Sequence, residues 1–170
     1  MFNQKVAALL NEQVNKELFS AYLYLDMSNW FSKKGLDGFA NWYKIQAQEE
    51  RDHAMLFYQY MLNNDLDVTL EAIAKPDKTF NCNMDVLKGA LGHEIFITES
   101  INTIYAAAYE VKDFRTMQFL DWFVKEQGEE EANSRELINK LELFGNDPKS
   151  LYMLNQELAG RTYSAPSLVL

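Results

Sequence analysis

The sequence predicts an all-α protein, a bundle of four long helices followed by a short fifth one. Three observations predict it. Apolar residues recur at spacings of three and four along most of the 170-residue chain, which is the period of a helix with one buried face. Only seven glycines and three prolines interrupt this pattern, and that favours long elements. Because 48% of the residues are apolar, residues 1–170 can form one domain with a substantial core.

The first predicted helix spans residues 5–34. Its inward-facing residues are Leu10, Val14, Glu17, Ala21, Tyr24 and Ser28. Lys33 and Lys34 would lie in the last turn, where positive charge suits the helix dipole. Gly35 would occupy the C′ position that commonly ends a helix.

The second predicted helix spans residues 38–63, with Asp37 as its N-cap. Its inward-facing residues are Phe39, Trp42, Gln46, Glu50, His53, Phe57 and Tyr60. Glu50 and His53 are three residues apart, so they share one face of the helix. A carboxylate and an imidazole on an apolar face must be paired, hydrogen-bonded or bound to a metal.

The connection at residues 64–83 is longer than most helix–helix connections. We interpret it as a crossover along the full length of the bundle, which makes the second and third helices parallel. A flexible linker is the alternative. The crossover is favoured because four apolar residues look able to dock on the bundle. They are Leu66, Val68, Leu70 and Ile73.

Two more long helices follow, at residues 84–111 and 114–144. Asn83 is the expected N-cap of the third helix and Asp113 that of the fourth. The third inward row is Leu87, Leu91, Glu94, Thr98, Ile101, Tyr105 and Ala108. The fourth is Leu120, Phe123, Gln127, Glu130, Ser134, Leu137 and Leu141.

The fifth helix is predicted at residues 148–159, after Gly145 ends the fourth. Asp147 would cap it, with Pro148 in the first helical position. The last ten residues look like an exposed tail.

Composition narrows the function classes. The formal net charge of −9, without a basic segment, argues against a nucleic-acid partner and favours cations such as divalent metals. The sequence contains no stretch of eighteen apolar residues, so no membrane-spanning helix is predicted. Residues 1–10 lack the pattern of a signal peptide, so we expect a cytoplasmic location. Cys82 is the single cysteine, which excludes an intrachain disulfide and a cysteine-based metal site.

Each long helix carries polar groups at the middle of its apolar face. They are Glu17; Glu50 and His53; Glu94; and Gln127 and Glu130. Taken singly, each could be a satisfied core residue or could face solvent. Together they are harder to dismiss, since an unpaired buried carboxylate costs several kcal/mol.

The spacing of these residues supports an internal repeat of two helical hairpins. Glu17 precedes Glu50 by 33 residues, and Glu94 precedes Gln127 by 33. An offset of 77 therefore relates the two halves, and it also places Glu49 on Glu126 and His53 on Glu130. The number of matches proves little, but the matches fall on the inward faces of paired helices.

The polar groups divide into two ligand sets. Glu17, Glu50 and His53 form one, and Glu50, Glu94 and Glu130 form the other, with Glu50 as a bridge. Oxygen ligands with one imidazole suit Fe(II), Mn(II) or Zn(II). The second site lacks a histidine, so it should hold its metal more weakly.

Two further features are open to more than one interpretation. Tyr24 lies two turns from Glu17 and could hydrogen-bond a ligand, donate an electron, or be an ordinary core tyrosine. A third, more exposed metal site could be formed by Glu49, Glu126, Glu129 and Glu130. The alternative for that group is a solvated acidic face, and we assign Glu131 to the surface.

With these residues in place, the chain resembles the ferritins, specifically the bacterial non-haem type. The matching residues are Glu17, Tyr24, Glu49, Glu50, His53, Glu94, Glu126, Gln127, Glu129 and Glu130. The resemblance implies a di-iron ferroxidase centre made of the two ligand sets, with Gln127 as a polar partner for the oxygen species. It also implies a third iron site at the outer acidic group, and a shell of 24 identical subunits that stores ferric oxyhydroxide.

Bacterioferritin matches less well. That family has a second Glu-x-x-His where this chain has Gln127-x-x-Glu130, and Asp52 stands near the place of its methionine haem ligand. We therefore expect no haem. Animal ferritins carry two acidic residues that line iron channels. The corresponding residues here are Met117 and Leu120, so iron access by an acidic three-fold channel is not expected.

The resemblance thus implies a ferroxidase that oxidises Fe(II) with O2 or hydrogen peroxide. Two alternatives stay open at this point. One is a different di-metal carboxylate enzyme, such as a peroxidase or oxygenase, and the other is a non-catalytic helical oligomer with structural buried carboxylates.

Overall fold

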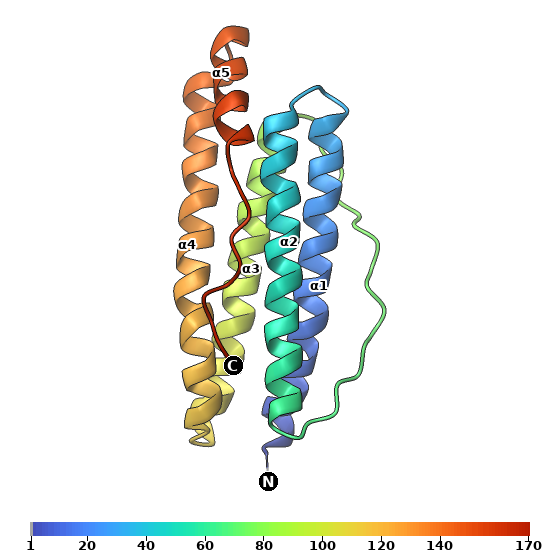
Figure 1. Ribbon diagram of the computed structural model, residues 1–170, viewed down its shortest axis with the longest axis vertical. Helices are drawn as coiled ribbons and strands as arrows, with labels where there is room; N and C mark the ends of the chain where they lie inside the picture. The colour runs from blue at the N-terminus through green and yellow to red at the C-terminus, as the bar shows by residue number, and fades with distance from the viewer. Residues whose placement is uncertain (1) are drawn as a thin grey trace.

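The computed structural model describes residues 2–170, so Met1 of the predicted domain lies outside the described residues. Its helices are α1 (Gln4–Ser32), α2 (Asp37–Asn63), α3 (Asn83–Glu110), α4 (Phe114–Phe144) and α5 (Pro148–Ala159). The first four form a bundle, and α5 stands at its upper end in Figure 1. The predicted all-α fold, with a long crossover and a short fifth helix, is confirmed. Within the described chain, none of the helices is long and apolar enough to cross a membrane.

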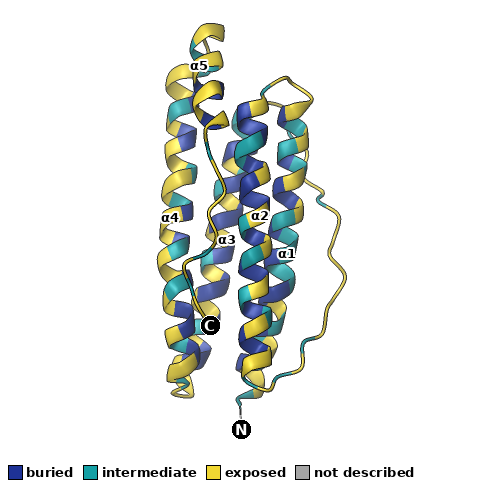
Figure 2. Cartoon of the chain, in the orientation of Figure 1, coloured by how far each residue is buried: buried dark blue, intermediate teal, exposed yellow. Residues whose placement is uncertain are grey.

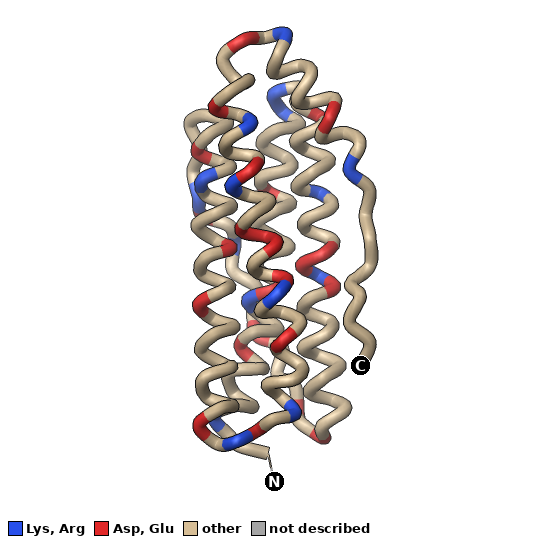
Figure 3. Tube along the Cα trace, turned by 90° about the vertical axis from the view of Figure 1, so that its left-hand side faces the viewer, with Lys and Arg blue, Asp and Glu red and all other residues tan. Residues whose placement is uncertain are grey.

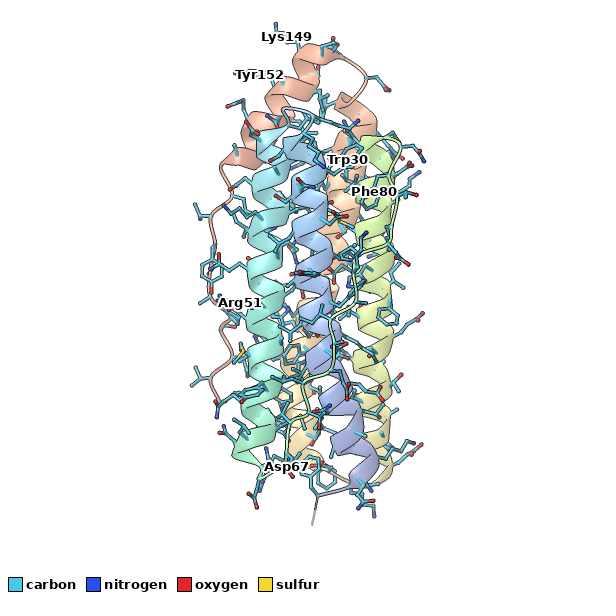
Figure 4. The ribbon with its side chains drawn as sticks, turned by 90° about the vertical axis from the view of Figure 1, so that its right-hand side faces the viewer. Trp30, Arg51, Asp67, Phe80, Lys149 and Tyr152 are labelled. Carbon is cyan, nitrogen blue, oxygen red and sulfur yellow. The ribbon has the colours of Figure 1, made fainter. Side chains whose placement is uncertain are left out.

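The crossover runs the length of the bundle on the outer side of α1 (Figure 1). Asp67 lies near one end of the molecule and Phe80 near the other (Figure 4). At the far end Phe80 packs edge-on against Trp30 of α1, with ring centroids 6.2 Å apart. Because the crossover carries the chain back to the end of the bundle where α2 begins, α2 and α3 run in the same direction, as predicted (Figure 1).

The crossover docks with fewer apolar residues than predicted. Leu66 and Val68 pack against the core, but Leu70 and Ile73 are 68% and 40% exposed, so their predicted docking was wrong. Polar contacts hold this part instead. The Asn11 side chain donates to the Thr69 carbonyl at 3.1 Å and accepts from the Thr69 amide at 2.8 Å.

Two predicted N-caps were wrong. Asp37 is the first residue of α2, and Leu36 at the cap makes no side-chain bond. Likewise α3 begins at Asn83 itself, after Cys82. The α2 amides are instead capped from a distance: Asn155 Oδ1 of α5 accepts from the Gly38 amide at 2.8 Å. Sequence signals near the helix could not indicate this cap, because the accepting side chain is supplied by another helix.

The remaining helix ends follow the predictions more closely. The Asp113 and Asp147 side chains accept from backbone amides and cap α4 and α5, and Pro148 stands at the start of α5. Gly35 has a φ of +70°, as a left-handed helix end requires. The last turn of α1 holds no basic residue, however, because Lys33 already serves as its C-cap. The expected placement of the lysines in that turn was therefore wrong.

The core consists of two apolar clusters with a polar layer between them. One cluster includes Leu23 and the other Val14, and Glu17 lies between these residues on α1. The same order occurs on each of the four long helices. Figure 2 shows the buried residues on the inward faces of the bundle. The mid-helix polar residues are therefore inside the molecule, not on a misjudged solvent face.

The segment 161–170 runs back along the bundle between α2 and α4 in the view of Figure 1. Most of its residues are exposed, as predicted, but the segment is not free. Trp122 Nε1 of α4 donates to Ser167 Oγ at 2.9 Å. The Tyr163 hydroxyl donates to Asp52 of α2, and Leu168 packs against the core. The segment thus spans two helices that have no Cα atoms within 8 Å of each other in the described chain.

Candidate metal centre

Three side chains form a compact buried group. Glu17 of α1 and Glu50 and His53 of α2 each offer a ligand atom, and these atoms all lie within 4.8 Å of one another. Each side chain is at most 2% exposed. His53 Nδ1 lies 3.2 Å from Glu50 Oε2, and the His53 ring packs edge-on against Trp122 and Phe123. Two carboxylates and an imidazole at this separation are a ligand set for a divalent metal.

One oxygen of each carboxylate is already held by a glutamine. Gln13 Nε2 donates to Glu17 Oε1 and Gln46 Nε2 donates to Glu50 Oε1, both at 2.8 Å. Glu17 Oε2 has no partner, and it is the one buried side-chain nitrogen or oxygen in the described chain without a hydrogen bond. A buried carboxylate oxygen left alone is costly. A cation at this point would satisfy it.

Further side chains extend this support away from the group. Ser100 Oγ of α3 donates to Gln13 Oε1 at 2.7 Å, and Lys16 Nζ donates to Ser100 Oγ at 2.8 Å. The sequence prediction missed the role of Gln13. A signal was present, because Gln13 precedes Gln46 by 33 residues, the same interval that separates Glu17 from Glu50.

Glu94 and Glu130 are buried at 2% and 6% exposure, but they lie outside the compact group. Both oxygens of Glu94 are occupied. The Tyr24 hydroxyl donates to Oε1, and Gln127 Nε2 donates to Oε2 at 3.1 Å. Tyr24 therefore contacts a ligand of the predicted second set, although its sequence position suggested the first. The second set is less prepared for a metal than the first.

The pKa values of the group reflect burial and mutual charge. Burial, reinforced by the Glu50 charge, raises the pKa of Glu17 and of Glu130 to about 8. The same causes raise the pKa of Glu94 well above its usual range. Burial alone would also raise the pKa of Glu50, but the charge and hydrogen bond of His53 lower it. Burial lowers the pKa of His53, yet the Glu50 carboxylate outweighs this and raises it to about 10.

The outer acidic residues lie around a cavity of about 290 Å³ between α2, α4 and the segment 161–170. Acidic positions on neighbouring helices meet near mid-height of the bundle (Figure 3). Glu49 and Glu126 are half-buried and Glu129 is exposed. They do not form a compact ligand group with Glu130 in the described chain. Burial raises the pKa of Glu49 and of Glu126, as expected for carboxylates in a narrow acidic pocket.

The family model described as "Ferritin-like domain" matches residues 7–144. The chain belongs to the ferritin family. The bacterial non-heme ferritin of Campylobacter jejuni is 40% identical to it over 156 residues, which cover 92% of this chain and 93% of that protein. The bacterial non-heme ferritin of Staphylococcus epidermidis is 35% identical, covering 96% and 99%. The predicted resemblance to bacterial non-haem ferritins is thereby confirmed.

Solved ferritin structures agree with this fold. The open-pore ferritin of the hyperthermophilic archaeon Archaeoglobus fulgidus superposes with a TM-score of 0.93 at 37% identity, covering 95% of this chain and 100% of that one. An engineered closed form of the same ferritin also gives 0.93, at 36% identity. The similarity covers all four long helices that carry the candidate ligands.

The structure bears on two assignments made from the sequence, the channel counterparts Met117 and Leu120 and the surface residue Glu131. Leu120 is fully buried in the core, so it cannot line a channel of any kind, and only the half-buried Met117 could. Glu131 is not a plain surface residue. It accepts hydrogen bonds from Thr98 at 2.7 Å and from Arg135 at 2.5 Å, which fix the face of α4 next to the buried group.

Proposed function

We propose that this ferritin oxidises Fe(II) at the buried group and stores the product as ferric oxyhydroxide within a shell of identical subunits. Iron is the substrate. The observation that carries the proposal is the compact group of Glu17, Glu50 and His53, in which one buried oxygen has no partner. Membership of the ferritin family, with bacterial non-heme relatives, supports the same function.

In the proposed reaction, Glu17, Glu50 and His53 bind the first Fe(II). Glu50, Glu94 and Glu130 bind the second, and Glu94 must give up a hydrogen bond from Tyr24 or Gln127 to do so. Each Fe(II) loses one electron. Dioxygen accepts both electrons and two protons and leaves as hydrogen peroxide. The peroxide can itself take two electrons from two further Fe(II) and two more protons, and it ends as two water molecules. The redox chemistry belongs to iron, and the protein supplies geometry and charge.

Proton release accompanies iron binding in this scheme. Glu17 and Glu130, with pKa values of about 8, are largely protonated at neutral pH in the metal-free protein. His53, with a pKa of about 10, is also protonated. All three must lose a proton to bind a cation. The buried group therefore exchanges protons for metal charge, which limits the net charge placed in the core.

The outer carboxylates extend the proposal beyond the first two ions. Glu49, Glu126, Glu129 and Glu130 would take a third iron between the buried group and the storage space, with Glu130 shared. We further propose a shell of 24 subunits, a cytoplasmic location and no haem. The absence of a methionine at Asp52 supports the last point.

The substitution Glu50→Ala tests the function. We expect the shell to assemble and rapid Fe(II) oxidation to be lost, because Glu50 contributes to both ligand sets. The exposed Glu99 of α3 gives a matched control, Glu99→Ala, which should oxidise iron at the wild-type rate.

Particle mass and iron retained per subunit should be measured after Fe(II) is added in air. A cage-sized particle that retains far more iron than its site count supports storage. A small particle with stoichiometric iron would favour another di-metal enzyme, and no bound iron would favour a structural oligomer. Unchanged fast oxidation by Glu50→Ala would refute the bridging role.

A further inference from the structure

Arg161 is the feature of the acidic cavity that the ferroxidase chemistry leaves unexplained. It follows α5 and opens the segment 161–170. Its guanidinium stacks on the Trp42 ring at 4.2 Å from the centroid, and its side chain is only 16% exposed. The Asn41 side chain donates to its carbonyl at 3.1 Å. An arginine fixed by stacking and backbone contacts is held in one place, unlike an arginine free on the surface.

The guanidinium is directed at the outer acidic group. Nη2 donates to Glu49 Oε2 at 2.5 Å, and Nη1 donates to Gln46 Oε1 at 3.0 Å. Gln46 in turn donates to Glu50 Oε1. The Glu49 side chain is 17% exposed, so this charge pair is largely shielded from water and is stronger than a surface pair. Arg161 thus contacts one outer carboxylate directly and reaches the bridging carboxylate through one amide.

Arg161 also belongs to the wall of the cavity. The cavity is bounded on one side by Glu49 and His53, on the other by α4, and across its front by Arg161 and residues 164–167. The guanidinium carries a permanent positive charge, so it neutralises Glu49 when no metal is there. A metal ion that uses the same Glu49 oxygen must displace it.

We propose that Arg161 competes with the third iron for Glu49 and so controls when iron passes from the buried group to the outer carboxylates. The inference rests on the proposed function, since it assigns a regulator to the third site of that function. With Arg161 in place, Glu49 is closed to the ion. When the guanidinium moves away, Glu49 becomes available beside Glu126, Glu129 and Glu130, and the segment 161–167 loses its contact with α2 at that point.

The test is a Zn(II) titration of the assembled protein, which needs no oxidation step. We expect Arg161→Gln to bind the third Zn(II) per subunit about tenfold more tightly than wild type, since a factor of ten corresponds to the loss of one modest charge pair. Arg161→Lys keeps the positive charge but not the planar guanidinium that bonds to Glu49 and Gln46 together. Its affinity for the third Zn(II) should therefore lie between those of wild type and Arg161→Gln. Arg115 donates to Asn64 at the far end of the bundle and is not among the residues of the described chain that line the acidic cavity, so Arg115→Gln should match wild type.

Glu49→Gln identifies the third step of the titration, because it removes a ligand of that site alone. In the double variant Glu49→Gln with Arg161→Gln, the increase in third-site Zn(II) affinity caused by Arg161→Gln should disappear. Equal or weaker third-site binding by Arg161→Gln overturns the proposal, as does a gain that persists without Glu49. Particle mass and far-ultraviolet circular dichroism confirm that each variant is folded. If wild type binds Zn(II) but does not oxidise Fe(II), the proposed function fails while this test still decides the role of Arg161.

Discussion

Glu17 and Glu94 show how a single hydrogen bond decides whether a buried carboxylate is ready for a metal. Glu17 has one oxygen held by Gln13 and one oxygen without a partner. Glu94 has both oxygens occupied, by Tyr24 and Gln127. We therefore expect the first ion to meet a carboxylate that is already oriented, and the second to displace a donor. On this basis we predict that the histidine-containing site fills first.

Gln13 should influence metal affinity at the first site although it is not one of the predicted ligands. Replacing it by leucine removes the donor that fixes Glu17, and we expect affinity for the first Zn(II) to fall about tenfold, as is typical when the partner of a metal ligand is lost. Ser100→Ala, one step further along the chain of hydrogen bonds, should have a smaller effect. The affinity of the first site for Zn(II), measured by competition with a chelator, checks both.

Gln59 supplies the control for that experiment, because it is exposed and, among residues 2–170, its side chain bonds only to Asn63. Gln59→Leu should leave the affinity unchanged. If Gln13→Leu also bound the first ion as tightly as wild type, the positioning role of Gln13 would be excluded.

The sequence predicted which residues of the candidate site are buried, and it did so from periodicity. Glu17, Glu50, His53, Glu94 and Glu130 stand on apolar faces, and that pattern is visible in one dimension. Arg161 was missed because its partner Glu49 lies 112 residues away along the chain. No local pattern reports such a contact. The metal-binding roles of all these residues stay predictions until the titrations are made.

At the scale of elements, α5 is tied to the start of α2 by Asn155. Its side chain accepts from the Gly38 and Phe39 amides, two of the amides that a helix start leaves unpaired. The backbones of α2 and α5 also approach each other closely at this point, since a Cβ added at Gly38 would lie 1.7 Å from the Asn155 carbonyl oxygen. The fifth helix thus completes α2, and α2 supplies Glu50 and His53.

We expect Asn155→Ala to lower the free energy of unfolding by about 1 kcal/mol, the usual cost of losing an N-cap. Gly38→Ala should cost more, about 3 kcal/mol, because the added methyl group must push α5 away. Chemical denaturation followed by circular dichroism measures both. Gly92 is the control: it lies in α3 with open space around its Cβ position, so Gly92→Ala should stabilise by about 0.5 kcal/mol. A Gly38→Ala protein as stable as Gly92→Ala would show that α5 is not held against α2.

Local sequence signals predicted some helix ends correctly and others wrongly, depending on whether the capping residue lies next to the helix in the sequence. Asp113 and Asp147 were assigned correctly because each caps a helix that starts next to it. Asp37 was assigned wrongly because the cap of α2 comes from α5. Leu70 and Ile73 were expected to dock because they are apolar, but Asn11 and Asn15 on α1 already hold the crossover backbone there. Apolar character alone does not show which side of an extended segment faces the core.

At the scale of the whole molecule, the repeat of two hairpins explains why the fold was predictable. The offset of 77 residues places α1 and α2 over α3 and α4, and the crossover carries the chain to the opposite end of the bundle, so that α3 starts at the end opposite to the start of α1 (Figure 1). The polar layer then falls at one level, because each helix carries its polar residue between the same two apolar clusters.

The net charge of −9 should act on iron capture and not on the oxidation step. An acidic protein attracts Fe(II) over a distance that salt shortens, from about 30 Å at 0.01 M to about 8 Å at 0.15 M. At limiting Fe(II), we expect the oxidation rate in air to fall about tenfold between these ionic strengths, within the range known for electrostatic steering. Stopped-flow absorbance of ferric product gives the rate.

Protein loaded with two Fe(II) per subunit without oxygen, and then mixed with O2, isolates the chemical step. Dioxygen carries no charge, and the candidate ligands of the buried group are at most 6% exposed, so salt should change this rate by less than about twofold. An equal salt effect in both experiments would place the charge dependence inside the centre. A salt effect seen only when Fe(II) is added from solution would assign the charge dependence to the protein surface. The route by which iron reaches Glu17 should then be sought among the acidic residues outside the core.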